Sequence, residues 1–197
     1  MKKNIFFTLL TLSFLFSCSS DSDTETPCTP IACLNNGVSN SDCGCDCPQG
    51  FTGDNCSIQI TPSKILITKI VVTKFPNLKS NGSNWDAFAL TGWERPDIFP
   101  SISNSQGNYL FAGNPINDSF SYGNDNFIFT PTAPIEITNF NNQFTIILWD
   151  DDGVNFTPEF MGGYDFYIYQ NNGFPQILDV STTTGSVAFK LYLSYQW

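Results

Sequence analysis

Short apolar runs alternate with polar clusters along most of the chain. From residue 58 to residue 197, runs rich in Ile, Val, Phe, Tyr and Thr are separated by Asn, Gly, Pro and Ser, with no 3.6-residue helical period. In QFTIILWD, Phe144, Ile146 and Leu148 share one face, and the alternate residues from Val187 to Leu193 do the same in SVAFKLYLSY. The pattern predicts strands at 64–75, 97–103, 108–112, 126–130, 135–139, 143–149, 164–169, 176–181 and 187–195. About eight such strands favour an all-β fold, a β-sandwich over residues 58–197.

The N-terminus has the pattern of an export signal. Two lysines precede an apolar stretch, residues 4–16, which is too short to span a membrane comfortably. The stretch ends in Leu15-Phe16-Ser17-Cys18, which resembles the lipobox of bacterial lipoproteins. The resemblance implies that residues 1–17 are removed and that Cys18 is lipidated, anchoring the chain in a membrane. An ordinary signal peptide with an incidental cysteine is the alternative.

Residues 18–27 are rich in Ser, Thr, Asp and Pro and contain no apolar side chain to bury, so they predict a flexible tether. Acidic runs directly after a lipidated cysteine resemble a surface-export signal of some Gram-negative lipoproteins. This resemblance implies an outer-membrane location that faces the cell exterior. A plain solvated linker explains the composition equally well.

All seven cysteines lie in the first part of the chain, before residue 57. With Cys18 set aside, an even number remains in a short segment that cannot form a hydrophobic core, which predicts a disulfide-stapled module over residues 28–56. Six cysteines allow fifteen pairings, and spacing alone does not choose among them.

The cysteine-rich segment resembles an EGF-like module. The resemblance rests on CLNNG, on the Cys-x-Cys step at Cys45 and Cys47, and on Gly-Phe-Thr-Gly-Asp-Asn-Cys at residues 50–56. What the resemblance implies is the set of pairs Cys28–Cys43, Cys33–Cys45 and Cys47–Cys56. The acidic motif of calcium-binding members is absent beside the first cysteine, so no metal is expected in this module. A rigid spacer is favoured over direct ligand recognition.

The net charge and the absence of histidine argue against several functions. The net charge is −10 and the isoelectric point is near 4.1, which disfavours nucleic acid as a partner. The chain has no His, so Ser-His-Asp and Cys-His systems and most zinc sites are excluded.

Acidic residues gather where one predicted strand ends. Asp150 and Asp152 leave the strand on the same side, Asp151 points away, and Glu159 returns before the next strand. Converging carboxylates raise one another's pKa values unless a cation neutralises them, and oxygen ligands from loops suit calcium. A plain surface turn at Asp152-Gly153 is the alternative.

The acidic strand end resembles the calcium-binding loops of C2 domains, as do the first strand and the segment around Asp97. The resemblance implies that Asp97, Asp150 and Asp152 are core calcium ligands, with Glu159 in the place of the last loop ligand and Asp86 in the first loop. No Lys or Arg occurs between Gly107 and Lys190, so the basic lipid-binding strand of many members is missing.

These features predict a lipid-anchored, surface-exposed binding or adhesion protein that is not an enzyme. Its ligand is a glycan, a lipid or a cell-surface protein, and aromatic loop residues (Trp85, Phe88, Trp93 and Phe156) supply contact area. One alternative is a structural envelope lipoprotein that uses calcium for stability only. A less favoured one is a carboxylate-dependent glycoside hydrolase that uses Asp150 and Glu159.

Overall fold

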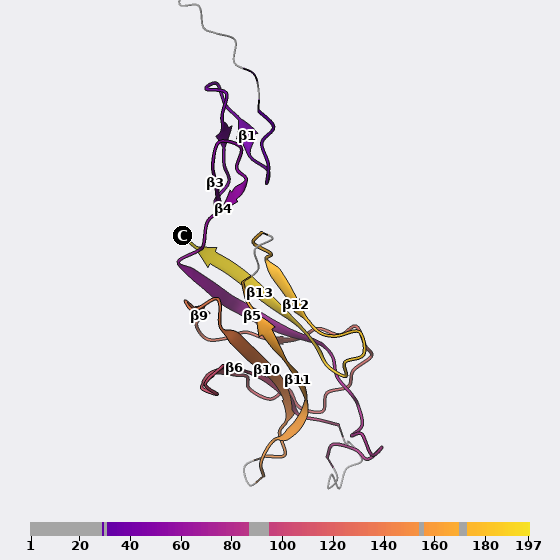
Figure 1. Cartoon of the computed structure of the whole chain (residues 1–197). Helices are drawn as coiled ribbons and strands as arrows, with labels where there is room; N and C mark the ends of the chain where they lie inside the picture. Colours follow the sequence, from indigo (N-terminus) through magenta and orange to yellow (C-terminus); the bar gives the residue numbers. More distant parts are fainter. Residues whose placement is uncertain (1–28, 30, 87–94, 154–155, 170–172) are drawn as a thin grey trace, which may run out of the picture.

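The computed structural model describes residues 29, 31–86, 95–153, 156–169 and 173–197 (Figure 1). The predicted signal peptide and tether, with Cys18 and Cys28, lie outside these residues. No helix within the described ranges is long and apolar enough to cross a membrane.

The large domain is a sandwich of two antiparallel sheets, as the strand pattern predicted. One sheet has the order β11-β10-β6-β7, formed by Glu159–Tyr167, Gln143–Asp150, Ile98–Asn104 and Tyr109–Ala112. The other has the order β12-β13-β5-β8, formed by Ile177–Val180, Ala188–Gln196, Lys64–Lys74 and Phe127–Phe129, and β9 (Ile135–Ile137) also pairs with β5. The all-β fold class is confirmed.

The core lies between the two sheets and is formed by alternate strand residues. Phe144, Ile146 and Leu148 are buried on β10, and every second residue from Phe189 to Leu193 is buried on β13. Burial of one face of each strand is the main stabilising contribution of such a sandwich.

The largest departure from the predicted strands is β11, which begins at Glu159 and not at residue 164. This stretch contains the adjacent glycines Gly162 and Gly163, and here glycine allows close approach of two strands. A Cβ atom on Gly163 would lie 2.5 Å from the carbonyl oxygen of Ile146. A register shift follows Leu148, so that Glu159 lies opposite Asp150.

The cysteine-rich module contains four short strands, β1 (Val38–Ser39), β2 (Cys45–Asp46), β3 (Phe51–Thr52) and β4 (Ile58–Gln59). Disulfides join Cys33 to Cys45 and Cys47 to Cys56, as the EGF-like pattern implies. Cys43 is also disulfide-bonded.

An aromatic joint connects this module to the sandwich. The ring of Phe174 packs edge-on against Phe51 at 5.4 Å and against Trp197 at 4.5 Å between centroids. The Gln59 amide adds two hydrogen bonds, donating to the Tyr169 hydroxyl and accepting from the Gly173 N–H, both at 2.9 Å. The module therefore sits at the end of the sandwich where β13 finishes (Figure 1).

Candidate calcium site

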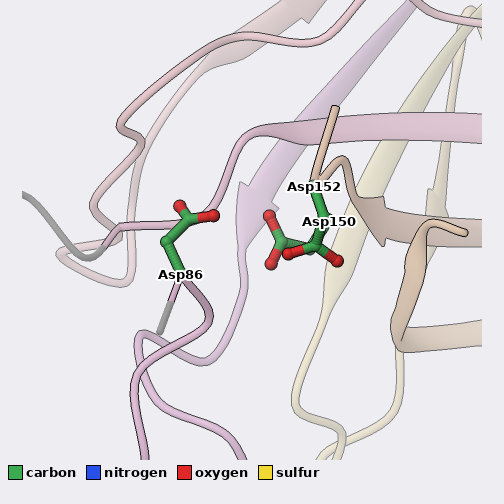
Figure 2. Close-up of side chains that lie close together, drawn as sticks. All are labelled: Asp86, Asp150 and Asp152. Carbon is green, nitrogen blue, oxygen red and sulfur yellow. The ribbon is translucent and has the colours of Figure 1, made fainter. Parts of the chain in front are cut away.

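Three carboxylates converge where β10 ends, and β10 ends at the end of the sandwich opposite the cysteine-rich module (Figure 1). Asp150 is the last residue of β10, Asp152 lies in the loop that follows, and Asp86 lies in the segment after β5. Each contributes an oxygen, and these oxygens lie within 4.8 Å of one another. Figure 2 shows the three side chains directed toward a common point.

Asp150 is the innermost member of this cluster. It continues the core-facing alternation of β10, which explains why its side chain is fully buried. Its Oδ1 accepts a hydrogen bond from the Asp97 N–H at 2.8 Å. Its Oδ2 is buried and has no hydrogen-bond partner among the described residues. A buried carboxylate oxygen without a donor is costly, and a bound cation would remove that cost.

Burial raises the pKa of Asp150 to about 7. The negative charges of Asp86, Asp152 and Glu159 contribute to this rise, and the hydrogen bond from the Asp97 N–H opposes it. At neutral pH the isolated site therefore holds its charge at a free-energy cost, which is the electrostatic setting that favours a cation.

Asp86 has the same character. Burial, followed by the charges of Asp97, Asp152 and Asp118, raises its pKa to about 6, and the Lys79 ammonium acts in the opposite direction. Burial first and Glu159 second raise the pKa of Asp152, and burial also raises that of Asp97.

Asp97 lies beside the cluster and is not one of its three members. Its side-chain Oδ1 accepts from the Asp118 N–H at 2.7 Å, and its carbonyl accepts from the Asp151 N–H at 2.9 Å. Together with its own N–H bond to Asp150, these contacts make Asp97 the residue that ties three acidic segments together.

Glu159 is held by a cation of the protein itself. Its Oε2 forms an ion pair with the Lys79 ammonium. The same ammonium lies 5.6 Å from the centre of the Trp85 ring. The structure thus brings Asp86, Asp150 and Asp152 together and leaves Glu159 at the edge of the site, paired with Lys79.

Two residues next to the site, Asp118 and Lys79, were not predicted from the sequence. Asp118 lies in an irregular loop with positive φ (51°), and Lys79 lies in a polar loop, so neither follows a strand end that would have marked it. Trp85, expected as a contact residue, is buried, and its indole N–H donates to the Pro76 carbonyl at 2.8 Å. Phe156 is 68% exposed, as expected for a contact residue. Phe88 and Trp93 lie outside the described residues.

No protein-family model matches the chain, and no curated protein is similar to it. Solved structures with a similar fold include human GIVD cytosolic phospholipase A2 in complex with methyl gamma-linolenyl fluorophosphonate inhibitor and terbium chloride, at 15% identity and a TM-score of 0.41. They also include a pair of C2 domains, A and B, of Extended-Synaptotagmin 2, at 14% identity and TM-score 0.35, and their calcium-bound form, at 16% and 0.34. These matches cover 69%, 76% and 70% of this chain, but only 18% of the phospholipase and 46% of each synaptotagmin chain.

The neighbours include C2 domains, one pair of them calcium bound, but with TM-scores below 0.5 they carry no argument about a metal in this chain. The cluster of three aspartates is by itself compatible with calcium binding. The expectation that the chain is not an enzyme is contradicted, because the phospholipase neighbours are an enzyme, and it is withdrawn. With TM-scores below 0.5 and less than a fifth of the enzyme covered, these neighbours assign no catalytic residue to this chain.

Proposed function

We propose that the sandwich binds calcium through Asp86, Asp150 and Asp152 and that the chain is a lipid-anchored surface protein that binds a ligand at this end. The observation that carries the proposal is the buried Asp150 Oδ2, which lacks a donor among the described residues and lies beside two further carboxylates. Carboxylate oxygens are the ligands that calcium prefers, and loop and backbone oxygens or water complete its shell.

Asp97 and Glu159 have supporting roles in this proposal. Asp97 positions Asp150 through its N–H and holds the Asp118 loop through its carboxylate. Glu159, already paired with Lys79, contributes negative charge from the edge of the site.

The lipoprotein part of the proposal rests on the lipobox-like Leu15 to Cys18 and the acidic tether. The EGF-like module, joined to the sandwich by Phe174 and Gln59, then acts as a spacer. The strand β10, whose last residue is Asp150, ends at the end of the sandwich opposite this spacer (Figure 1), which suits presentation of a ligand site away from the membrane. A purely structural role of calcium is the alternative, and it predicts stabilisation by calcium without any ligand binding.

The test is the melting temperature of the full chain with millimolar calcium or with chelator, together with an Asp150→Asn/Asp152→Asn variant. Calcium should raise the melting temperature of the parent by several degrees and leave the variant unchanged, since a ligand of the native state stabilises by mass action. If the parent has the same melting temperature in calcium and in chelator, the three aspartates do not bind calcium and the proposal is wrong. Binding of the chain to glycans, phospholipid vesicles or bacterial cells, with and without chelator, then separates the surface-binding role from the structural one.

A further inference from the structure

An aromatic row crosses the outer face of the four-stranded sheet. Trp149 on β10 lies directly opposite Phe160 on β11 and Phe99 on β6. The rings of Trp149 and Phe160 meet edge to face with their centroids 6.1 Å apart. Phe160 is 60% exposed. These rings therefore lie on the solvent side of the sheet, opposite the core side that buries Asp150.

A cavity of about 300 Å³ adjoins this row. Its lining residues are Phe99, Ser101, Tyr109, Ala112, Trp149 and Pro158. Tyr109 is 67% exposed at its rim, whereas Ser101 is only 2% exposed at its floor. The floor and one wall are fixed to each other, because the Trp149 indole N–H donates to the Ser101 hydroxyl at 2.8 Å.

Ser101 points to the chemistry of a ligand. Its hydroxyl oxygen accepts from Trp149, but its own O–H has no acceptor among the described residues. A buried hydroxyl normally donates as well as accepts, so the cavity offers a donor that a ligand oxygen would satisfy. A purely apolar ligand would cover this donor without pairing it, at a cost.

The charges around the cavity narrow the ligand class. The strands β6, β7, β10 and β11 contain no Lys or Arg. Of their three acidic residues, Asp150 and its cross-strand partner Glu159 lie on the core side, and only Asp165, next to Thr145, lies on the same side as the cavity. A phosphate, a carboxylate or nucleic acid would find no cation on these strands to pair with. The face complements a neutral molecule that has both apolar ring surface and hydroxyl groups.

We propose that this cavity binds one neutral sugar unit of a glycan. The C–H face of the sugar would pack on Trp149 and Phe99, whose ring faces carry partial negative charge, while its hydroxyls pair with Ser101 and the Tyr109 hydroxyl. Pockets that combine aromatic walls with a few placed polar groups are the usual form of a small-molecule site.

This site deepens the proposed surface-binding function, on which it rests, and it lies next to the calcium cluster in the chain. Trp149 precedes Asp150, and Pro158 precedes Glu159. Calcium that orders the ends of these strands would therefore also order two cavity walls, and by linkage calcium and the sugar would strengthen each other's binding.

The experiment is a titration of the full chain with neutral oligosaccharides, namely maltotetraose, cellotetraose, xylotetraose, mannotetraose and chitotetraose, with calcium present and with chelator. Tryptophan fluorescence and calorimetry report sugar binding, and a separate calcium titration reports the metal site. Variants Tyr109→Ala and Ser101→Ala test the rim and the floor. Tyr167→Ala is the matched control, since Tyr167 is also exposed (54%) and lies opposite Gln143 at the far end of β10.

We expect saturable binding of at least one oligosaccharide, weakened about tenfold by Tyr109→Ala and by Ser101→Ala and unchanged by Tyr167→Ala. Circular dichroism of each variant must match the parent, so that a lost fold is not counted as a lost contact. Binding that is equal in the parent and both cavity variants overturns the proposal. So does a chain that binds calcium but no sugar, and so does preferential binding of decanoate or of a phenylalanine-rich peptide in competition with the sugar.

Discussion

At the level of single residues, the acidic cluster gathers three carboxylates around one buried oxygen. Asp150 Oδ2 lacks a donor among the described residues, and burial together with neighbouring charge raises the pKa of Asp150 to about 7 and that of Asp86 to about 6. The native state thus binds protons more tightly at these positions than the unfolded chain does.

This difference sets the pH dependence of stability without calcium. Because the folded-state pKa values lie above the ordinary value of 3.8, the free energy of unfolding should fall as the pH rises from about 4 to about 7 and level off above that. For Asp150 the loss is on the order of 4 kcal/mol at most. Urea unfolding in chelator at pH 5 and pH 8 measures it. Asp150→Asn should flatten the dependence, and a chain more stable at pH 8 than at pH 5 in chelator would contradict the assignment.

Lys79 offers a second test at this scale. Its ammonium pairs with Glu159 and lowers the pKa values of Asp86 and Asp152. Because its positive charge lies close to the same carboxylates, it competes with a bound cation. Lys79→Gln should tighten calcium binding about threefold and lower stability in chelator. Calorimetry measures the affinity.

The control for Lys79 is Lys64→Gln, which removes a lysine from a second ion pair, the exposed one with Glu136. Calcium affinity should not change in this variant. A Lys79→Gln chain that binds calcium more weakly than the parent would show that Lys79 supports the site and does not oppose it.

The sequence could predict the acidic residues at strand ends but not their partners. Asp150 and Asp152 follow from period-two alternation, which places both on one side of β10. Three other features depend on how separate loops pack against one another, which no local sequence pattern predicts. They are the Lys79–Glu159 pair, the Asp118 contact and the burial of Trp85.

At the level of elements, the pairing of β10 with β11 determines the geometry of the site. The register shift after Leu148 places Glu159 opposite Asp150, and Gly163 lets the strands approach where a Cβ atom would lie 2.5 Å from a backbone oxygen. Strand centres were predictable from alternation, but the start of β11 was not, because two adjacent glycines resemble a loop until the neighbouring strand is known.

Gly163→Ala should therefore destabilise the sandwich by about 1–3 kcal/mol, through displacement of β11 from β10. Chemical unfolding measures the change. Gly44→Ala is the control, because its Cβ would meet its nearest neighbour, Asn40, at an ordinary 3.5 Å. Equal stability of the two variants would show that the two strands yield without cost.

At the level of the whole molecule, the aromatic joint makes the cysteine-rich module and the sandwich one extended body. Phe174 contacts the module through Phe51 and the end of β13 through Trp197, and Gln59 adds hydrogen bonds from the module side. The sequence predicts a boundary between residues 56 and 58 but not this contact, which joins residues more than a hundred positions apart.

Phe174→Ala should loosen the joint without unfolding either part. Small-angle X-ray scattering should then show that the variant samples a broader range of maximum dimensions than the parent samples. The disulfides should stay intact. Phe156→Ala is the control, since Phe156 is an exposed phenylalanine in the loop between β10 and β11. An unchanged scattering profile for Phe174→Ala would show that Phe174 does not hold the module against the sandwich.

The most direct test of the calcium cluster is isothermal calorimetry of the full chain with calcium at pH 7.5, beside Asp152→Asn and Asp151→Asn. We expect saturable binding by the parent, at least tenfold weaker binding by Asp152→Asn, and near-parent binding by Asp151→Asn, since Asp151 is not one of the three converging residues. Absence of binding by the parent at millimolar calcium, or equal weakening by both substitutions, would contradict this expectation.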